Sequence, residues 1–264
     1  MTEIGISGAA GRMGRRVLAL ALADEAFAVK AAVEADGHEA LGKDAARLVG
    51  VADTGVMVES RLARKVDVLL DFSSPAGTLK RLEECRRLGV AIVIGTTGLG
   101  KGEMEAVERV ARTIPCLVSA NMSLGVNLLT KLVAEAAAAL GNSYDVEIIE
   151  AHHRMKKDAP SGTALLLARM IAESKGTTLD DVAVYGRCGH TGERPRGVMG
   201  IHAIRGGDIV GDHTVLFAGD GERIELVHRA HSRDTFAKGA LRAAQFLAGK
   251  SPGFYTMDDV LGIK

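Results

Sequence analysis

The segment from Glu150 to Thr163 concentrates side chains that can do chemistry. It reads Glu-Ala-His-His-Arg-Met-Lys-Lys-Asp-Ala-Pro-Ser-Gly-Thr. Its adjacent imidazoles, His152 and His153, can exchange protons near neutral pH, and its cations can hold carboxylates. Ser161-Gly162-Thr163 predicts the start of a helix, where free backbone N–H groups and the positive end of the helix dipole form a second anion site. An acid–base group beside two anion sites indicates a small, doubly charged substrate.

The two histidines are expected to have different roles. Neighbouring side chains on a strand point to opposite faces, so both can serve one site only if the chain bends between them. Nearby cations favour proton release, which makes His152 and Lys156 the candidate proton donors and leaves the choice between them open. A solvated basic loop is the competing interpretation. No metal site is predicted, because the histidines lack i, i+4 spacing and a cysteine or acidic partner at ligand distance.

A second motif lies near the N-terminus, between a predicted strand at 3–7 and a predicted helix at 12–22. It is Gly8-Ala9-Ala10-Gly11-Arg12-Met13-Gly14. Glycines at this spacing permit a tight turn and a close approach of the backbone to a pyrophosphate. Glu34 ends the next predicted strand, where a carboxylate can accept hydrogen bonds from both ribose hydroxyls. The motif therefore predicts a dinucleotide site.

Further residues are expected to contact or select the dinucleotide. Two loops follow predicted strands, Gly95-Thr96-Thr97-Gly98 and Ser119-Ala120-Asn121-Met122, and they can line the nicotinamide ribose. Ala35 stands where an arginine would be a natural partner for a 2′-phosphate, and Glu34 would repel that phosphate. We therefore predict that NADH is used at least as well as NADPH.

The elements that must position these residues fall into two groups. Strands and helices alternate up to about residue 121, and the apolar runs at 66–72 and 90–95 are typical of buried parallel strands. Long strands then follow in succession at 197–205, 213–218 and 223–229, and a periodic helix spans 234–247. We predict an α/β protein with an N-terminal Rossmann-like doubly wound parallel sheet (residues 1–123 plus 232–264) and a central α+β domain with a mixed, mostly antiparallel sheet (124–231).

Composition excludes several classes of function. The chain has 264 residues, zero formal net charge and 3% aromatic residues, so nothing favours a nucleic-acid or membrane-surface partner. Its three cysteines are far apart, which argues against a disulfide framework and favours a reducing cytoplasm. No signal peptide is expected, and no uncharged run approaches the roughly 20 residues that span a bilayer.

At these motifs the chain resembles the 4-hydroxy-tetrahydrodipicolinate reductase (dihydrodipicolinate reductase) family of bacterial lysine biosynthesis. The resemblance covers essentially the whole chain, and Glu150–Thr163 is its most specific part. It implies reduction of 4-hydroxy-2,3,4,5-tetrahydrodipicolinate to tetrahydrodipicolinate, with NADH, NADPH or both as cofactor. It also implies a cytoplasmic homotetramer assembled through the central domain.

The resemblance also implies a role for each matched position. His152 donates or accepts the proton and Lys156 is a second donor, while His153, Gly162 and Thr163 hold the carboxylates. The implied cofactor contacts are Gly8, Ala9, Ala10, Gly11, Arg12, Met13, Glu34, Gly95, Thr96, Thr97, Ser119, Ala120, Asn121 and Met122. Ala35, Ser74 and Met122 depart from some members of the family, and these departures bear on cofactor preference.

Two alternatives remain at this point. One is another NAD(P)-dependent reductase of a small dicarboxylate on the same scaffold; semialdehyde dehydrogenases among these need an activated cysteine, and Cys116 has no neighbouring base in sequence. The other is a non-catalytic dinucleotide sensor, which would need no proton donor beside a carboxylate clamp.

Overall fold

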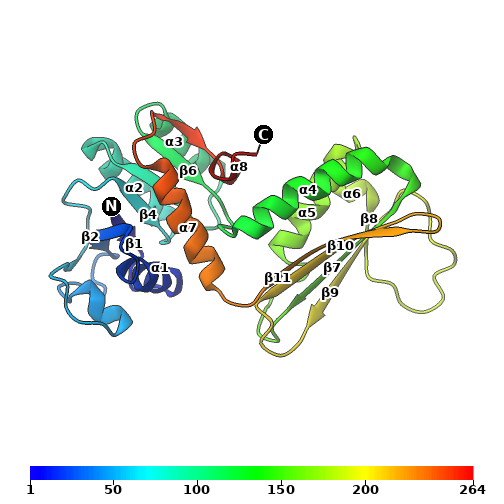
Figure 1. The fold of residues 1–264 in the computed structure, drawn as a ribbon, viewed down its shortest axis with the longest axis horizontal. Helices are drawn as coiled ribbons and strands as arrows, with labels where there is room; N and C mark the ends of the chain where they lie inside the picture. Colours follow the sequence, from blue (N-terminus) through cyan, green and yellow to red (C-terminus); the bar gives the residue numbers. More distant parts are fainter. Residues whose placement is uncertain (264) are drawn as a thin grey trace. The chain divides into compact units, whose positions relative to one another are not determined.

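A computed structural model describes residues 1–263. The chain forms two compact units, one made of Met1–Leu124 with the chain from Asp234 onward, the other of Gly125–Arg233. The chain therefore passes from one unit to the other twice, after Leu124 and after Arg233. Each unit has its own sheet (Figure 1).

The first unit contains a seven-stranded sheet in which every pairing is parallel. Its order is β12-β6-β5-β4-β1-β2-β3. The strands are β1 (Thr2–Ser7), β2 (Phe27–Val33), β3 (Val58–Glu59), β4 (Val68–Asp71), β5 (Ala91–Ile94), β6 (Pro115–Val118) and β12 (Gly253–Tyr255). The strand order reverses at β1, with β2 on one side and β4 on the other. Ligands of such sheets bind at this switch point, outside the carboxyl ends of the strands, and the predicted doubly wound sheet is confirmed.

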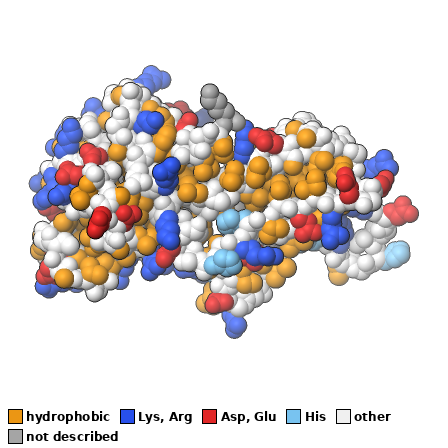
Figure 2. All heavy atoms as spheres, in the orientation of Figure 1, with side chains coloured by type: hydrophobic (Ala, Val, Ile, Leu, Met, Phe, Trp, Pro, Cys, Tyr) orange, Lys and Arg blue, Asp and Glu red, His pale blue; other side chains and the backbone are white. Residues whose placement is uncertain are grey.

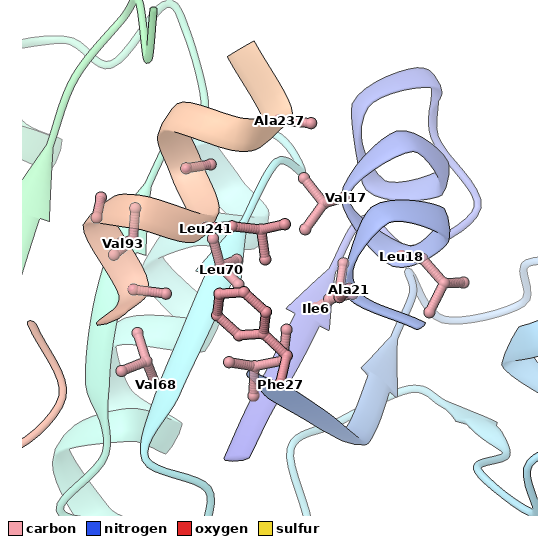
Figure 3. Close-up of a cluster of buried hydrophobic side chains, with 14 of the residues drawn as sticks. Ile6, Val17, Leu18, Ala21, Phe27, Val68, Leu70, Val93, Ala237 and Leu241 are labelled. Carbon is pink, nitrogen blue, oxygen red and sulfur yellow. The ribbon is translucent and has the colours of Figure 1, made fainter. Parts of the chain in front are cut away.

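Helices cover both faces of this sheet. On one face α1 (Arg12–Leu22) and α7 (Asp234–Leu247) lie side by side, and Val17, Ala237 and Leu241 meet strand residues such as Leu70 in one buried cluster (Figure 3). On the other face α2 (Pro75–Leu88) and α3 (Lys101–Ala111) cover a second cluster. The short helices η1 (Ala45–Val49) and α8 (Met257–Leu261) complete the unit.

The second unit contains a five-stranded mixed sheet in the order β11-β10-β7-β9-β8. The strands are β7 (Asp145–His152), β8 (Ala183–Tyr185), β9 (Met199–Arg205), β10 (Gly211–Ala218) and β11 (Arg223–Ala230). The antiparallel pairings join β11, β10 and β7, whereas β9 is parallel to both β7 and β8. The predicted mixed sheet is confirmed. Its parallel half arises because the chain crosses over between β7 and β9 through α5.

One face of this second sheet is covered by α4 (Leu124–Leu140) and α5 (Gly162–Ser174), which bury an apolar cluster against it. Short helices η2 (Gly141–Ser143) and α6 (Leu179–Val182) follow α4 and α5, respectively. The strands alternate accordingly: in β10 the residues His213, Val215 and Phe217 are buried and those between them are partly exposed. The opposite face carries exposed apolar side chains, including Ile149, Ile204 and Val227.

Within residues 1–263, one segment, Leu124–Ser143, is long and apolar enough to cross a bilayer. It carries Lys131 and Glu135, and Leu129 and Val133 of α4 are buried in the core of the second unit. One side of α4 therefore packs in the core of the second unit. Hydrophobic side chains also lie along its outer surface (Figure 2), where Leu128 is exposed.

Candidate active site

The glycine-rich loop is a turn whose shape excludes side chains. Gly8 has a φ of +72°, and a Cβ there would lie 2.4 Å from the carbonyl oxygen of Phe72. A Cβ at Gly14 would lie 2.0 Å from the carbonyl oxygen of Gly8, so these glycines allow helix α1 to pack directly against the loop. No side-chain hydrogen bond caps α1 at Gly11. A helix N-terminus of this kind suits a pyrophosphate.

Glu34 follows β2 and is tied to this loop. Its Oε2 accepts a hydrogen bond from the Ala10 N–H (2.9 Å) and its Oε1 accepts one from the Ala35 N–H (3.1 Å). Gly8, Gly11 and Glu34 line a cavity of about 550 Å³. The glycine cradle, the uncapped helix and the carboxylate at the switch point together fit the adenosine and pyrophosphate part of a dinucleotide.

Residues around α2 also line this cavity, and of these the sequence had indicated only Ser74. Ser73 and Ser74 precede α2, and Lys80 and Arg81 lie on it; all four line the cavity. Lys80 pairs with Asp36 at 3.2 Å. These residues are more than thirty positions from Glu34 in the sequence, and only the parallel packing of β1, β2 and β4 brings them to the same edge.

The two later loops lie at the carboxyl ends of β5 and β6. The Thr96 hydroxyl donates to the fully buried carboxylate of Asp71 (3.0 Å), and Gly95 leaves room for the Phe72 ring, which would lie 2.1 Å from a Cβ. The loop is therefore fixed by Asp71 and Phe72 at the end of β4. Met122 is 2% exposed in the core, so its backbone is the part that remains for a cofactor contact.

The other predicted cofactor residues differ in what they present. Ala9 is fully buried in the core, Arg12 is exposed at the start of α1, and Met13 packs partly on the core. Ser119 donates its hydroxyl proton to the carbonyl oxygen of Asn121 (2.7 Å), closing a small turn after β6. Thr96 is buried with its hydroxyl engaged, so the polar side chains that remain exposed or partly exposed for a cofactor in this half of the site include Glu34, Thr97 and Arg12.

In the second unit, Glu150 and His152 point to the same, helix-covered face of β7. Glu150 is fully buried and His152 is 9% exposed. His152 Nδ1 lies 2.6 Å from Glu150 Oε2. The guanidinium of Arg205 on β9 donates to both Glu150 oxygens (2.8 and 2.7 Å), and the Ser161 N–H donates to Oε1 (3.0 Å).

These contacts set the charge of the pair. Burial raises the pKa of Glu150, but the hydrogen bonds from Arg205, His152 and the Ser161 N–H outweigh it, and the net pKa lies below its usual value. Burial lowers the pKa of His152; Glu150 opposes this, and the charges of Lys156 and Arg205 add to the lowering. Glu150 is therefore ionised, and His152 releases a proton more readily than a free imidazole does.

The chain bends after His152, where β7 ends. The His153 N–H donates to the carbonyl oxygen of Ile209 (2.7 Å), and the Lys156 N–H donates to the carbonyl oxygen of His153 (3.1 Å). The ring of His153 lies beside Arg233, with Nε2 3.5 Å from the guanidinium. Its Nδ1 is buried without a hydrogen-bond partner among residues 1–263. His152 and His153 thus face different surroundings.

Lys156 and the start of α5 lie on the same connection. The Lys156 ammonium donates to both oxygens of Asp158 at 2.9 Å. Ser161 caps α5, since its Oγ accepts from the Ala164 N–H (3.2 Å). Gly162 is exposed, with open space where a side chain would be, so a ligand carboxylate can approach the first turn of the helix beside Thr163.

Sequence reasoning left out several side chains at this site, namely Glu150 as a functional group, Arg205, His213 and Arg233. His213 of β10 is 3% exposed, its ring centre lies 5.2 Å from that of His152, and its Nε2 lies 3.2 Å from Ser161 Oγ. Burial lowers the pKa of His213 to about 4, so it is neutral near pH 7. No group of three or more potential metal ligands occurs in the described part of the chain.

Comparison with known proteins gives consistent matches over both units. Residues 2–122 match the family model "Dihydrodipicolinate reductase, N-terminus" and residues 125–261 match "Dihydrodipicolinate reductase, C-terminus". The chain is 49% identical over 267 residues to the 4-hydroxy-tetrahydrodipicolinate reductase of Syntrophobacter fumaroxidans, covering 100% of both chains. It is 54% identical to that of Alkalilimnicola ehrlichii, covering 99% of both.

Solved structures give matches consistent with these relatives. A dipicolinate-bound dihydrodipicolinate reductase from Paenisporosarcina sp. TG-14 has a TM-score of 0.78 at 27% identity, covering 97% of both chains. An amine dehydrogenase from Mycobacterium smegmatis, at 12% identity and a TM-score of 0.60 over 97% of this chain and 95% of that one, shares the fold alone. By its two family models and its full-length relatives, the chain belongs to the 4-hydroxy-tetrahydrodipicolinate reductase (dihydrodipicolinate reductase) family.

Proposed function

We propose that this chain reduces 4-hydroxy-2,3,4,5-tetrahydrodipicolinate to tetrahydrodipicolinate, with loss of water and a reduced nicotinamide dinucleotide as hydride donor. As a member of its family, the chain is an oxidoreductase of lysine and diaminopimelate biosynthesis. The observation that carries the proposed chemistry is the pair of His152 and buried Glu150 beside Lys156 and the first turn of α5. A sensor of dinucleotides would need no such acid–base group.

The chemistry requires a proton to follow the hydride. Loss of the ring hydroxyl as water leaves a carbon–carbon double bond conjugated to the ring C=N. The reduced nicotinamide supplies hydride to that double bond. As negative charge develops on the ring, a proton must arrive, and His152 and Lys156 are the donors that we propose. His152 is held by Glu150, and Lys156 is held by Asp158 until a ligand carboxylate competes for its ammonium.

A dicarboxylate substrate is supported by the relative that binds dipicolinate. We assign its carboxylates to His153, Gly162 and Thr163, with Arg233 as an additional cation beside His153. The exposed first turn of α5 offers backbone N–H groups and the positive helix dipole, and the imidazole and guanidinium offer charge-assisted hydrogen bonds.

For the cofactor, we propose that NADH is used at least as well as NADPH. Glu34 lies at the ribose end of the cavity, tied to the glycine-rich loop, and Ala35 beside it offers no positive charge. A 2′-phosphate there meets the carboxylates of Glu34 and Asp36. The two cations on that wall are already paired, Lys80 with Asp36 and Arg81 with Glu84.

We further propose that the protein acts in the cytoplasm as a homotetramer, without nucleic-acid or membrane partners. The uncovered face of the second sheet supports assembly, because it exposes Ile149, Ile204 and Val227, of which Ile149 and Val227 flank Thr214 of β10. Apolar side chains gathered on an uncovered sheet face favour burial against another subunit.

A coupled assay tests the reaction. Dihydrodipicolinate synthase generates the substrate in situ, and the decrease in absorbance of NADH or NADPH reports its reduction. We expect substrate-dependent oxidation of both cofactors, with kcat/KM for NADH equal to or above that for NADPH. A strong preference for NADPH would refute the cofactor assignment, whereas cofactor binding without any substrate-dependent oxidation would favour the sensor.

A further inference from the structure

Every oxygen of the Glu150 carboxylate is engaged, although the side chain is fully buried. Oε1 accepts from the Ser161 N–H and from Arg205, and Oε2 accepts from Arg205 and faces His152 Nδ1. A buried carboxylate with this number of donors is ionised and held in one orientation. Glu150 therefore behaves as a fixed negative charge beneath the imidazole.

This arrangement determines where the protons of His152 lie. An ionised carboxylate only accepts hydrogen bonds, so the 2.6 Å contact requires a proton on His152 Nδ1. Nε2 is then the nitrogen that gains or loses a proton. It makes no hydrogen bond within the described chain, and it faces Gly211 of β10, where a Cβ would lie 3.0 Å away. Glycine at 211 thus leaves space next to the reactive nitrogen.

The charged and titratable groups around His152 come from several elements. Glu150 lies on the same strand, Arg205 on β9, His213 on β10 and Lys156 on the loop that follows β7. His213 is neutral near pH 7 because burial lowers its pKa to about 4. Glu150 is consequently the only negative group among these neighbours, and it opposes the effects of burial and of the two cations.

We propose that Glu150 is a positioning residue for the reaction: it fixes His152 as the Nδ1–H tautomer, presents Nε2 as the atom that exchanges the proton, and stabilises the protonated ring, while Arg205 keeps Glu150 ionised and in place. The role rests on the proposed function, since it assigns a partner to the proposed proton donor. Glu150, His152 and Arg205 all lie within the second unit.

The test is the Glu150→Gln variant, in which an amide of similar shape replaces the charge. We expect kcat to fall by about 10- to 100-fold with KM changed little, the size of loss seen when a metal-bound histidine loses the partner that orients it. Because the protonated imidazole loses its counter-charge, the pKa of His152 falls, and the high-pH limb of the kcat profile moves to lower pH.

Nitrogen-15 NMR of the histidine rings gives a readout that needs no substrate. In the wild-type protein, His152 is expected to be predominantly the Nδ1–H tautomer, and in Glu150→Gln the tautomers mix and the midpoint of titration falls. If the chain lacked reductase activity, this result would still stand. An unchanged tautomer and midpoint in Glu150→Gln overturns the inference whatever the activity.

Glu147 provides a matched control. It lies on the same strand with its side chain on the opposite face, and it too is contacted by arginine (Arg187, 2.9 Å) and histidine (His202, 2.7 Å). Glu147→Gln should leave kcat, its pH profile and the His152 resonances unchanged. An equal effect of both substitutions means that only the stability of the sheet is involved, and it refutes the proposal.

Arg205→Lys separates positioning from a purely structural ion pair. It keeps a positive charge beside Glu150, and the carboxylate remains available to His152. We expect a smaller loss of kcat than in Glu150→Gln, with the Nδ1–H tautomer retained. If Arg205→Lys matches Glu150→Gln in both measurements, the ion pair and not the contact to the imidazole is responsible, and the assignment fails.

Discussion

His152 and Lys156, the two proposed proton donors, lie in different surroundings. The imidazole is nearly buried and hydrogen-bonded to Glu150, whereas the ammonium is partly exposed and paired with Asp158, itself 63% exposed. Lys156 can therefore exchange Asp158 for a ligand carboxylate, whereas His152 stays paired with the buried Glu150. The two side chains are therefore expected to affect catalysis in different ways.

Substitution of each donor should separate these effects. His152→Gln keeps a donor toward Glu150 but removes the exchangeable proton, so we expect kcat to fall by about 10²–10⁴-fold with KM little changed. Lys156→Ala removes both a proton donor and a carboxylate partner, so it should lower kcat and raise KM. Steady-state kinetics measure both, and near-normal kcat in both variants would remove them from the mechanism.

Lys157→Ala is the control for charge alone, because Lys157 is an exposed neighbour of Lys156. It should retain nearly wild-type kinetics. If it matched Lys156→Ala, the loop would act through its net positive charge and not through one ammonium group.

At the residue scale, the sequence predicted the two histidines but not the residues that orient His152. Glu150 was open to prediction, because residues two apart on a strand share a face, and Glu150 lies two positions before His152. The role of Arg205 could not be predicted from the sequence. Its place depends on the parallel register of β7 with β9, in which His152 pairs with Arg205, and no local pattern gives the register of strands that are 50 residues apart.

Among the elements, the contact between the glycine-rich loop and α1 leaves no room for a side chain at Gly14. We expect Gly14→Ala to lower the free energy of unfolding by about 1–3 kcal/mol, the usual cost of forcing atoms into a packed site, because its Cβ would meet the Gly8 carbonyl oxygen at 2.0 Å. The displaced loop should also raise KM for the dinucleotide. Chemical denaturation and cofactor titration measure the two effects.

Gly102→Ala is the matched control within a helix. Gly102 lies in α3, and no atom lies within 4 Å of a Cβ built there. Alanine should stabilise this helix by about 0.5–1 kcal/mol through its higher helix propensity. Equal behaviour of the two variants would show that the close approach at Gly14 carries no cost.

Sequence patterns predicted the longer elements well. The bounds of α1 and α7 agree with the predicted 12–22 and 234–247 because both helices have regular apolar spacing. Helix α2 begins at Pro75, since Ser74 caps it and proline fits its first turn. The strands β3, β8 and β12 were missed, because segments of two or three residues become strands only through pairing with a neighbour.

For the molecule as a whole, the proposed assembly depends on the uncovered face of the second sheet. Ile149 is 37% and Val227 44% exposed on that face. We expect Ile149→Glu to convert the proposed homotetramer into smaller species, because a carboxylate in an apolar interface loses its hydration without gaining a partner. Light scattering coupled to size-exclusion chromatography reports the mass.

Leu79→Glu is the corresponding control, since Leu79 is similarly exposed (39%) but lies on α2 of the first unit. Its assembly should match that of the wild-type protein. A wild-type mass for Ile149→Glu, or a monomeric wild-type protein, would contradict assembly through this face.

The return of the chain to its first unit affects how the protein itself folds during translation. Helix α7 supplies Ala237, Ala240, Leu241, Ala244 and Leu247 to the core that α1 and β1 began, and β12 adds an edge strand to that sheet. On the ribosome, the segment 125–233 is complete before these residues emerge. The first unit, although its N-terminal part is translated first, therefore completes its core last. Until the C-terminal segment is synthesised, its apolar residues stay exposed to aggregation and proteolysis.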